Sequence, residues 1–518
     1  MAEYDAIVIG AGHNGLICST YLARSGLKVL VLERSDRIGG ACVTEELWPG
    51  FRVSTAAYAL SLLLPEVVSE LGLKLDVRPK DPMVFAPLDD GGGLMLWRDP
   101  AKRKDEIAKL SPRDAERYPE FISLFAEAAT RLRPLLTFPA TRKQVRRAFR
   151  ASEVERLFKR TVDGSIAELC EEYFESDLLQ GLMASQGIIG SAAGPRTPGT
   201  AYLYLHHAFG TAAGELGEWG LVRGGMGAIT QELERVARAA GVEIKLNAAV
   251  AAVSLAGKRK VKGVALETGE EFAAPAVFSN ADPKRTVALV ERGALPPEFV
   301  EDVQLIPTDG TVVKVNCALS GLPRFTDMNG TSPGPEHTAT ITVSPSIDYL
   351  EEGARAAAEG RAAEAMFCEA WIQTASEPEL APPGKHTLSI FAQYAPYQLA
   401  DGHWTTRREE IGDRVIATLE RYAPGLSSLI EHRLVLGPPD LEERFGLTGG
   451  NIFHGELLPE WLFDRRPATG WHRHRTPLPG LYLCGSGAHP GGGVCGAPGR
   501  SAARAYLQDG VASGGYSP

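Results

Sequence analysis

The N-terminal stretch constrains the fold most, because a buried strand, a glycine-rich turn and a helix follow one another there. Residues 4–9 (YDAIVI) form a short apolar run that suits a strand covered on both faces of a parallel sheet. The turn GAGHNG follows at 10–15, and residues 14–25 have the pattern of a helix. A second apolar run, KVLVL at 28–32, leads directly to Glu33. This order of elements is typical of a βαβ unit that binds the phosphates of a dinucleotide.

Each glycine of the turn has a separate physical role. Gly10 permits the tight turn, Gly12 lets the backbone approach a pyrophosphate, and Gly15 allows the helix to pack closely on the strand. The helix N-terminus adds free N–H groups and a partial positive charge. We therefore expect His13 and Asn14, in the first turn of that helix, to shape the phosphate site.

The residues after the second strand favour one dinucleotide over another. Glu33 lies 18 residues after Gly15, where a carboxylate accepts hydrogen bonds from both hydroxyls of an adenosine ribose and repels a 2′-phosphate. The pair Gly39–Gly40 then follows within seven residues. An NAD site needs no second glycine loop, whereas the longer flavin dinucleotide does. The sequence therefore predicts FAD and disfavours NADP.

The segment Glu33-RxxRxGG is similar to the FAD fingerprint of the amine oxidase and phytoene desaturase superfamily. The opening GAGHNGL and the stretch ACVTEE resemble one branch, the phytoene desaturase-like oxidoreductases. That branch includes the pyridine nucleotide-disulfide oxidoreductase domain-containing protein 2 group and the desaturase-type carotene ketolases. Many members carry Arg directly after the glycine pair, whereas this chain has Ala41. The missing cation is expected to come from Arg34 or Arg37.

The C-terminal segment at 480–505 (GLYLCGSGAHPGGGVCGAPGRSAARA) is the second strong motif. The same motif ends the chain in carotenoid desaturases, and its glycines would let a flat ring lie against bare backbone. A helix start near 493–496 would place N–H groups at the pyrimidine end of the isoalloxazine. The resemblance puts His489 near the flavin, where it is a candidate for handling a proton; a structural hydrogen bond in the loop is the alternative.

The middle of the chain repeats the α/β pattern between 222 and 247, and VRGGMGAIT opens its helix. In such proteins the residue at the position of Val250 holds adenine through its backbone. The cofactor-binding residues expected from all three segments are Gly10, Gly12, His13, Asn14, Gly15, Glu33, Arg34, Gly39, Gly40, Ala41, Gly225, Met226, Val250, Gly485, Ser486, Gly493 and Val494.

The predicted fold class is α/β: a discontinuous, Rossmann-like FAD-binding domain of the glutathione reductase type, with an interleaved α+β substrate domain. The resemblance covers essentially the whole chain. The expected boundaries are 1–84, 216–289 and 441–518 for the FAD domain and 85–215 and 290–440 for the substrate domain. In the substrate domain, helices are expected at Arg117–Leu136 and Val154–Phe174, and strands at 311–319, 365–373 and 387–394.

The resemblance implies an FAD-dependent oxidoreductase that acts on a hydrophobic, isoprenoid-like or lipid-like small molecule. A single complete GxGxxG unit argues against an NADPH domain, so oxygen, a quinone or another acceptor would re-oxidise the flavin. Two alternatives stay open: an FAD-dependent amine oxidase, and an FAD-binding protein whose main role is regulation or interaction. The pairs His206–His207 and Tyr202/Tyr204 are candidates for the cavity lining.

The charge balance bears on partners. There are 54 Lys and Arg against 64 Asp and Glu, a net charge of −10, which argues against a nucleic-acid partner. Residues 131–160 are locally basic, which fits either peripheral docking on an anionic membrane or a solvated helical face. The sequence does not indicate an oligomeric state.

Processing signals and cysteine spacing bear on the compartment. The seven Cys show no CxxC spacing, and neither a signal nor a transit peptide is visible, which favours a cytoplasmic protein with reduced thiols. His472 and His474 alternate with arginines but lack an apparent third ligand, so no metal site is expected.

Overall fold

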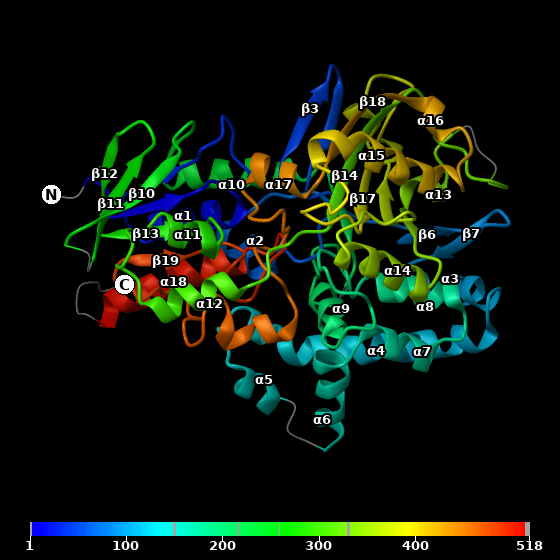
Figure 1. The fold of residues 1–518 in the computed structure, drawn as a ribbon, viewed down its shortest axis with the longest axis horizontal. Coiled ribbons are helices and arrows are strands. Elements are labelled where there is room, and N and C mark those ends of the chain that lie inside the picture. Colours follow the sequence, from blue (N-terminus) through cyan, green and yellow to red (C-terminus); the bar gives the residue numbers. More distant parts are fainter. Residues whose placement is uncertain (1–2, 149–151, 215–216, 258–259, 329–331, 513–518) are drawn as a thin grey trace.

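The N-terminal strand β1 (Ala6–Ile9) lies at the centre of a five-stranded parallel sheet, on the left in Figure 1. The computed structural model describes residues 3–148, 152–214, 217–257, 260–328 and 332–512. The strand order is β19 (Leu481–Leu483), β13 (Ala276–Ser279), β1, β2 (Val29–Leu32) and β9 (Glu243–Lys245). The sheet thus joins the N-terminal, middle and C-terminal segments, which confirms the predicted fold class.

The two faces of this sheet are covered by different elements, because alternate residues of a strand point to opposite sides. Ala6 and Val8 of β1 belong to the core formed with helices α1 (His13–Arg24), α10 (Gly227–Ala239) and α18 (Ala497–Ala512). Ile7 and Ile9 instead pack towards an antiparallel meander. That meander consists of β10 (Val250–Leu255), β11 (Val261–Leu266) and β12 (Glu271–Ala273).

A second, seven-stranded sheet lies at the upper right of Figure 1. Its order is β18 (Ile430–Leu436), β14 (Val312–Leu319), β17 (His386–Gln393), β16 (Phe367–Trp371), β15 (Thr340–Val343), β6 (Val84–Pro87) and β7 (Gly93–Leu96). Two short antiparallel pairs accompany it: the hairpin of β3 (Thr44–Trp48) with β4 (Phe51–Ser54), and β5 (Val77–Pro79) with the distant β8 (Gly220–Val222). The expected strands of the substrate domain are therefore present.

A helical layer lies below the second sheet in Figure 1. It contains α3 (Pro100–Ala108), α4 (Pro112–Leu132), α5 (Arg142–Ala148), α6 (Ser152–Phe158), α7 (Ile166–Tyr173), α8 (Asp177–Ser185) and α9 (Thr200–Ala208). The remaining helices are α2 (Pro65–Leu71), α11 (Pro283–Ala288), α12 (Pro297–Leu305), α13 (Pro335–Thr338), α14 (Ile347–Ala358), α15 (Trp404–Glu420), α16 (Leu426–Leu429) and α17 (Pro438–Phe445).

The expectation of one continuous helix over Val154–Phe174 is wrong. The chain leaves the helical path at Gly164, where a Cβ atom would lie 2.6 Å from the carbonyl oxygen of Arg160. Ser165 then caps the next helix by accepting a hydrogen bond from the Glu168 backbone N–H in a capping box. The spacing of Ser165 and Glu168 is the sequence signature of a helix N-terminus, and it marks the break.

The core of the first sheet also includes α12, through Phe299 and Val303. Packing therefore groups this helix with the parallel sheet, although the sequence boundaries assign 290–440 to the substrate domain.

All seven cysteines are free and buried. Among the described residues, no helix has both the length and the apolar character that a bilayer crossing requires.

Candidate functional site

Two glycine loops meet backbone to backbone beyond the carboxyl end of β1. Gly12 and Gly39 form an isolated parallel bridge, and the Gly39 N–H donates to the Ala11 carbonyl at 2.9 Å. A Cβ atom on Gly40 would lie 3.4 Å from the Cα of Gly12. Side chains at these positions would therefore fill the floor of the cavity that both loops line. Such bare backbone is what close approach of a pyrophosphate requires.

The N-terminus of α1 opens onto this floor. Its N-cap is Gly12, which supplies no capping side chain, so the first N–H groups of the helix are left for an anion. His13 lines the cavity, and its Nε2 atom is buried without a partner. Burial lowers the pKa of His13 to about 4, so the ring is neutral at physiological pH. Asn14 lies behind the floor and donates to the Ser486 hydroxyl at 3.3 Å.

The adenosine end of the cavity is built around Glu33. One carboxylate oxygen accepts the Ala11 N–H at 2.7 Å, and the other accepts the Ser35 N–H at 2.9 Å. Each oxygen keeps a lone pair, so both can still accept a ribose hydroxyl. Val250, the first residue of β10, lines the same cavity, and its expected adenine contact stays a prediction.

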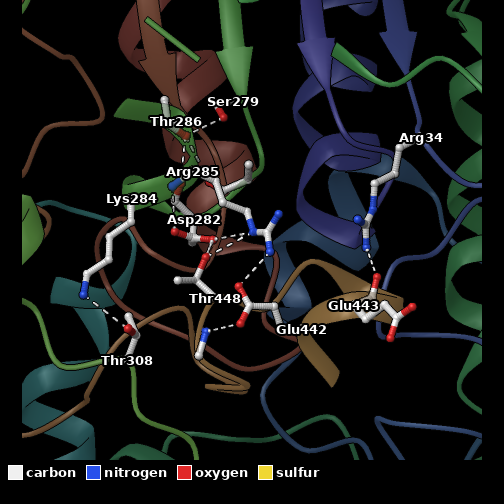
Figure 2. Close-up of polar contacts among 12 residues, drawn as sticks. Arg34, Ser279, Asp282, Lys284, Arg285, Thr286, Thr308, Glu442, Glu443 and Thr448 are labelled. Carbon is white, nitrogen blue, oxygen red and sulfur yellow. Dashed lines mark hydrogen bonds and ion pairs between the residues drawn. The ribbon is translucent and has the colours of Figure 1, made fainter. Parts of the chain in front are cut away.

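Helix α17 crosses over this end of the cavity and is tied to three separate segments of the dinucleotide side. Arg285 of α11 donates to Glu442 at 2.9 Å, and Arg34 donates to the Glu443 carbonyl oxygen at 2.8 Å (Figure 2). The network extends from Arg285 to the Thr448 hydroxyl at 3.1 Å, and Thr448 also donates to Asp282 (Figure 2). These contacts hold the helix in place as one wall of the site.

The third tie of α17 is a buried carboxylate between two arginines. Glu45 of β3 accepts hydrogen bonds from Arg444 of α17 at 2.8 Å and from Arg37 at 2.6 Å. Arg37 also forms an ion pair with Asp36, and Arg34, Arg37 and Arg444 all line the cavity. The sequence offered Arg34 or Arg37 in place of the arginine missing at Ala41. Arg444 is a third candidate for this cation, and the sequence reasoning missed it.

The C-terminal glycine loop supplies Ser486, Gly493 and Val494 to the cavity lining. His489, the candidate for a proton-handling role, lies outside that lining. Its Nε2 atom is 2.7 Å from the Leu135 carbonyl oxygen, and burial lowers its pKa to about 4. The contact is the structural hydrogen bond that the sequence reasoning held as the alternative.

Three other residues expected to bind the cofactor, Gly225, Met226 and Gly485, do not line the cavity but pack the elements around it. A Cβ atom on Gly225 would lie 2.3 Å from the Thr44 hydroxyl oxygen, and the Met226 N–H donates to Ser54 at 3.0 Å. Both residues thus fasten the β3–β4 hairpin to α10. A Cβ atom on Gly485 would lie 2.5 Å from the Asn280 carbonyl oxygen, so this glycine joins β19 closely to β13.

The far end of the cavity is lined by residues of the second sheet and of α9. Lys314 of β14 donates to the Ser389 hydroxyl at 2.7 Å, and its Nζ atom lies 4.2 Å from the centroid of the Tyr58 ring. Burial lowers the pKa of Lys314 to about 7. His207 and Trp219 line the same cavity. Of the four proposed lining residues on α9, His207 reaches the cavity, while Tyr202, Tyr204 and His206 pack in the core.

The sequence reasoning missed Lys314, although a signal was present. The strand VVKVNCAL is apolar apart from two polar residues at alternate positions, Lys314 and Asn316, which therefore share one face. A buried lysine in such a strand is rare unless it has a partner or a function. Among the described residues, no cluster of His, Cys, Asp or Glu is arranged to hold a metal ion.

The whole site is one cavity of about 940 Å³. This volume lies near the upper limit of the range of roughly 300–1,000 Å³ that ligand pockets occupy. It runs from the glycine floor and the adenosine end to the chamber at Lys314 and Tyr58, so an extended dinucleotide and a second molecule can share it. The glycine floor, the open helix N-terminus and the unpartnered Nε2 atom of His13 together fit the phosphates of such a ligand.

Comparison with known proteins agrees with this geometry. Residues 15–505 match the family model described as flavin containing amine oxidoreductase. The chain is 37% identical to pyridine nucleotide-disulfide oxidoreductase domain-containing protein 2 of Mus musculus, covering 98% of this chain and 94% of that protein. It is 27% identical to phytoene desaturase (lycopene-forming) of Pantoea ananas, covering 96% and 98%.

An oxidoreductase from Methanosarcina mazei has the same fold. Its crystal structure superposes with a TM-score of 0.63 at 17% identity, covering 97% of this chain and 100% of that one. The predicted family resemblance is confirmed, and FAD is the cofactor of this family.

The glycine floor can be tested by adding a side chain to it. In Gly12→Leu the Cβ atom would lie 2.9 Å from Asn280 Nδ2, and the rest of the side chain would occupy the space above the glycine floor. We expect the variant to fold but to lose the visible flavin absorbance after purification. Gly321→Leu is the control, because a Cβ atom there meets its nearest neighbour at 3.9 Å. Stoichiometric FAD in Gly12→Leu would refute the pyrophosphate assignment.

The role of Arg444 can be tested through FAD affinity. Removing a charge-assisted hydrogen bond typically costs about 1.5–3 kcal/mol, which corresponds to a rise in Kd of roughly tenfold or more. We therefore expect Arg444→Ala to raise the Kd of the apoprotein for FAD by at least about tenfold, and to weaken the dependence of that Kd on salt. Arg355→Ala removes an exposed arginine that pairs with Glu352 and should leave the Kd unchanged. An unchanged Kd for Arg444→Ala would contradict the assignment.

Proposed function

Since the chain belongs to the family of flavin containing amine oxidoreductases, we propose that it is an FAD-dependent oxidoreductase that dehydrogenates or oxidises a hydrophobic, isoprenoid-like or lipid-like substrate. The observation that carries this proposal is the chamber that continues the dinucleotide cavity into the second sheet. A ligand in the chamber would lie beside the end of an FAD molecule bound along the glycine floor.

The chamber has mainly apolar walls. Apolar and aromatic lining residues of this part of the cavity are Tyr58, Leu62, Ile189, Trp219, Val312, Phe391, Leu436, Leu447, Ile452 and Phe453. These side chains favour burial of hydrocarbon, at about 25 cal/mol per Å² of apolar surface removed from water. The relative that is a phytoene desaturase supports a hydrophobic substrate for this chain.

The residues of the chain have a limited chemical task in this reaction. When bound, FAD supplies the hydride acceptor. The apolar walls exclude water and orient the substrate, and Lys314, whose pKa is lowered to about 7 by burial, is placed to hold a proton at its Nζ atom. Oxygen, a quinone or another acceptor would complete the cycle.

An amine oxidase is the second candidate, and the aromatic lining favours it. Tyr58, Trp219, Phe391 and Phe453 all line the cavity, and aromatic faces suit an alkylamine substrate. A neutral Lys314 would not repel such a substrate.

Anaerobic bleaching of the bound flavin separates the candidates. We expect the flavin absorbance of the purified holoprotein to fall on mixing with polyenes or long-chain lipids and to remain with primary and secondary amines. Heat-denatured, FAD-free protein is the control for spectral changes in the panel compounds themselves. Bleaching by amines alone would reverse the ranking. Inertness towards every compound, with FAD bound, would favour a role in regulation or interaction.

We further propose that the basic segment 131–160 contacts anionic membranes. Helices α5 and α6 project from the body of the molecule, at the bottom of Figure 1. Phe138 beside them is 57% exposed, and Lys143, Arg147 and Arg156 are exposed as well. Arg142 and Arg160 instead form ion pairs with acidic neighbours, and Arg150 lies outside the described residues. An exposed aromatic beside exposed cations suits the headgroup region.

Liposome co-sedimentation tests this contact. We expect the holoprotein to sediment with phosphatidylserine vesicles at low salt, and the triple variant Lys143→Glu, Arg147→Glu, Arg156→Glu to stay in the supernatant, because each cation contributes about 1 kcal/mol near an anionic surface. Arg355→Glu, Arg361→Glu and Arg421→Glu together provide a charge-matched control away from this segment. Sedimentation of the wild type at the background level would rule out the contact.

A further inference from the structure

The cavity-facing side of the second sheet carries Lys314 together with further polar residues that the proposed function does not use. In the strand register Lys314 of β14 lies opposite Phe391 of β17, and Phe391 lies opposite Glu369 of β16. Two positions along, Asn316, Ser389 and Trp371 form the next row on the same face. The other face of these strands is an apolar core. The face of the sheet next to the cavity thus carries buried polar groups between its aromatic residues.

Tyr58 lies across this face and connects its two charged members. Its hydroxyl donates to one carboxylate oxygen of Glu369 at 2.9 Å, and its ring lies under the Nζ atom of Lys314. The other oxygen of Glu369 accepts the Gln186 side-chain N–H at 2.7 Å. Glu369 is 6% exposed and Lys314 is 2% exposed. A path of contacts therefore leads from the chamber wall to a carboxylate behind it.

A second buried lysine faces the same carboxylate. Lys80, which is 5% exposed, donates to the Thr340 hydroxyl at 3.2 Å and lies over the Trp371 ring. The titratable groups around Glu369 are thus Tyr58, Lys80 and Lys314, while Gln186 is neutral. One carboxylate can balance one ammonium group, and a second buried ammonium would lack a counter-charge. One of the two amines is therefore expected to be neutral near pH 7.

The directions of the pKa shifts are consistent with one carboxylate facing two buried amines. Burial lowers the pKa of Lys314 to about 7 and that of Lys80 well below its usual value, while the charge of Glu369 raises both. Burial raises the pKa of Glu369 itself, and the hydrogen bond from Tyr58 acts against that rise. Lys314 lies in the cavity lining, so it is the amine that a substrate can reach.

We propose that Glu369 is a positioning residue which, together with Tyr58, keeps the Lys314 amine able to take up a proton from the substrate. The inference rests on the proposed function only in placing the flavin ring and substrate beside Lys314. In a dehydrogenation, one C–H bond of the substrate would break, and FAD, when bound, would supply the acceptor for its hydride. The proton of the neighbouring X–H bond passes to the lone pair of Lys314 Nζ, and the electrons of that bond form the new double bond. The Glu369 carboxylate balances the ammonium so formed.

A pH titration of the flavin spectrum tests the proposal without any substrate. Protonation of an amine beside the oxidised flavin should shift its visible band, with a midpoint near pH 7 in the wild-type holoprotein. Removing the carboxylate charge in Glu369→Gln should lower this midpoint by about one pH unit, since an opposite charge nearby favours the charged amine. Lys314→Met should abolish the transition. Glu336→Gln, which removes another buried carboxylate of the second domain, should keep the wild-type midpoint.

A second variant guards against misfolding of Glu369→Gln. Tyr58→Phe keeps the ring under Lys314 but removes the hydrogen bond that stabilises the Glu369 carboxylate, so the midpoint should fall in the same direction. An unchanged midpoint in a folded Glu369→Gln, an unchanged midpoint in Tyr58→Phe, or a transition that survives Lys314→Met would each overturn the proposal. The titration needs bound FAD but no turnover, so failure of the substrate panel and failure of this inference are separate results.

Discussion

The fold depends on backbone segments that approach each other with no side chain between them. A Cβ atom on Gly15 would lie 2.1 Å from the Gly10 carbonyl oxygen, and one on Gly499 would lie 2.3 Å from the Asn14 carbonyl oxygen. The same holds for Gly485 against Asn280. These contacts join the N-terminal, middle and C-terminal segments at the carboxyl ends of the parallel strands. Because a crevice forms there in open α/β sheets, the same contacts that close the domain also leave the floor for a dinucleotide.

The second sheet depends on this floor for its orientation. Helix α17 directly follows β18 of the second sheet, and its residues Glu442, Glu443 and Arg444 each contact a different segment of the first domain. Since α17 is fastened in this way, the face of the second sheet that carries Lys314 and Phe391 is held over the cavity. The arrangement explains how strands distant in sequence from the glycine loops come to line the same cavity.

Much of the first domain could be predicted from the sequence because its signals are local. The apolar runs, the GAGHNG turn and Glu33 lie within one βαβ unit, and the resemblance supplied the C-terminal motif. The side-chain contacts of the substrate domain could not be predicted in the same way. Lys314 and Glu369 are 55 residues apart in sequence and become neighbours only through the register of β14, β17 and β16. Arg444 was missed for the same reason, because its partner Glu45 belongs to a hairpin near the other end of the chain.

The two ends of the cavity use one arrangement of charges in two ways. Glu45 lies between Arg37 and Arg444 at the dinucleotide end, and Glu369 lies near Lys80 and Lys314 at the chamber end. Arginine does not lose its proton in proteins, so the first group remains cationic and suits a phosphate. Lysine loses its proton readily when it is buried, so the second group can exchange one proton instead of holding a fixed charge. The choice between arginine and lysine beside a buried carboxylate thus separates binding of the cofactor from chemistry on the substrate.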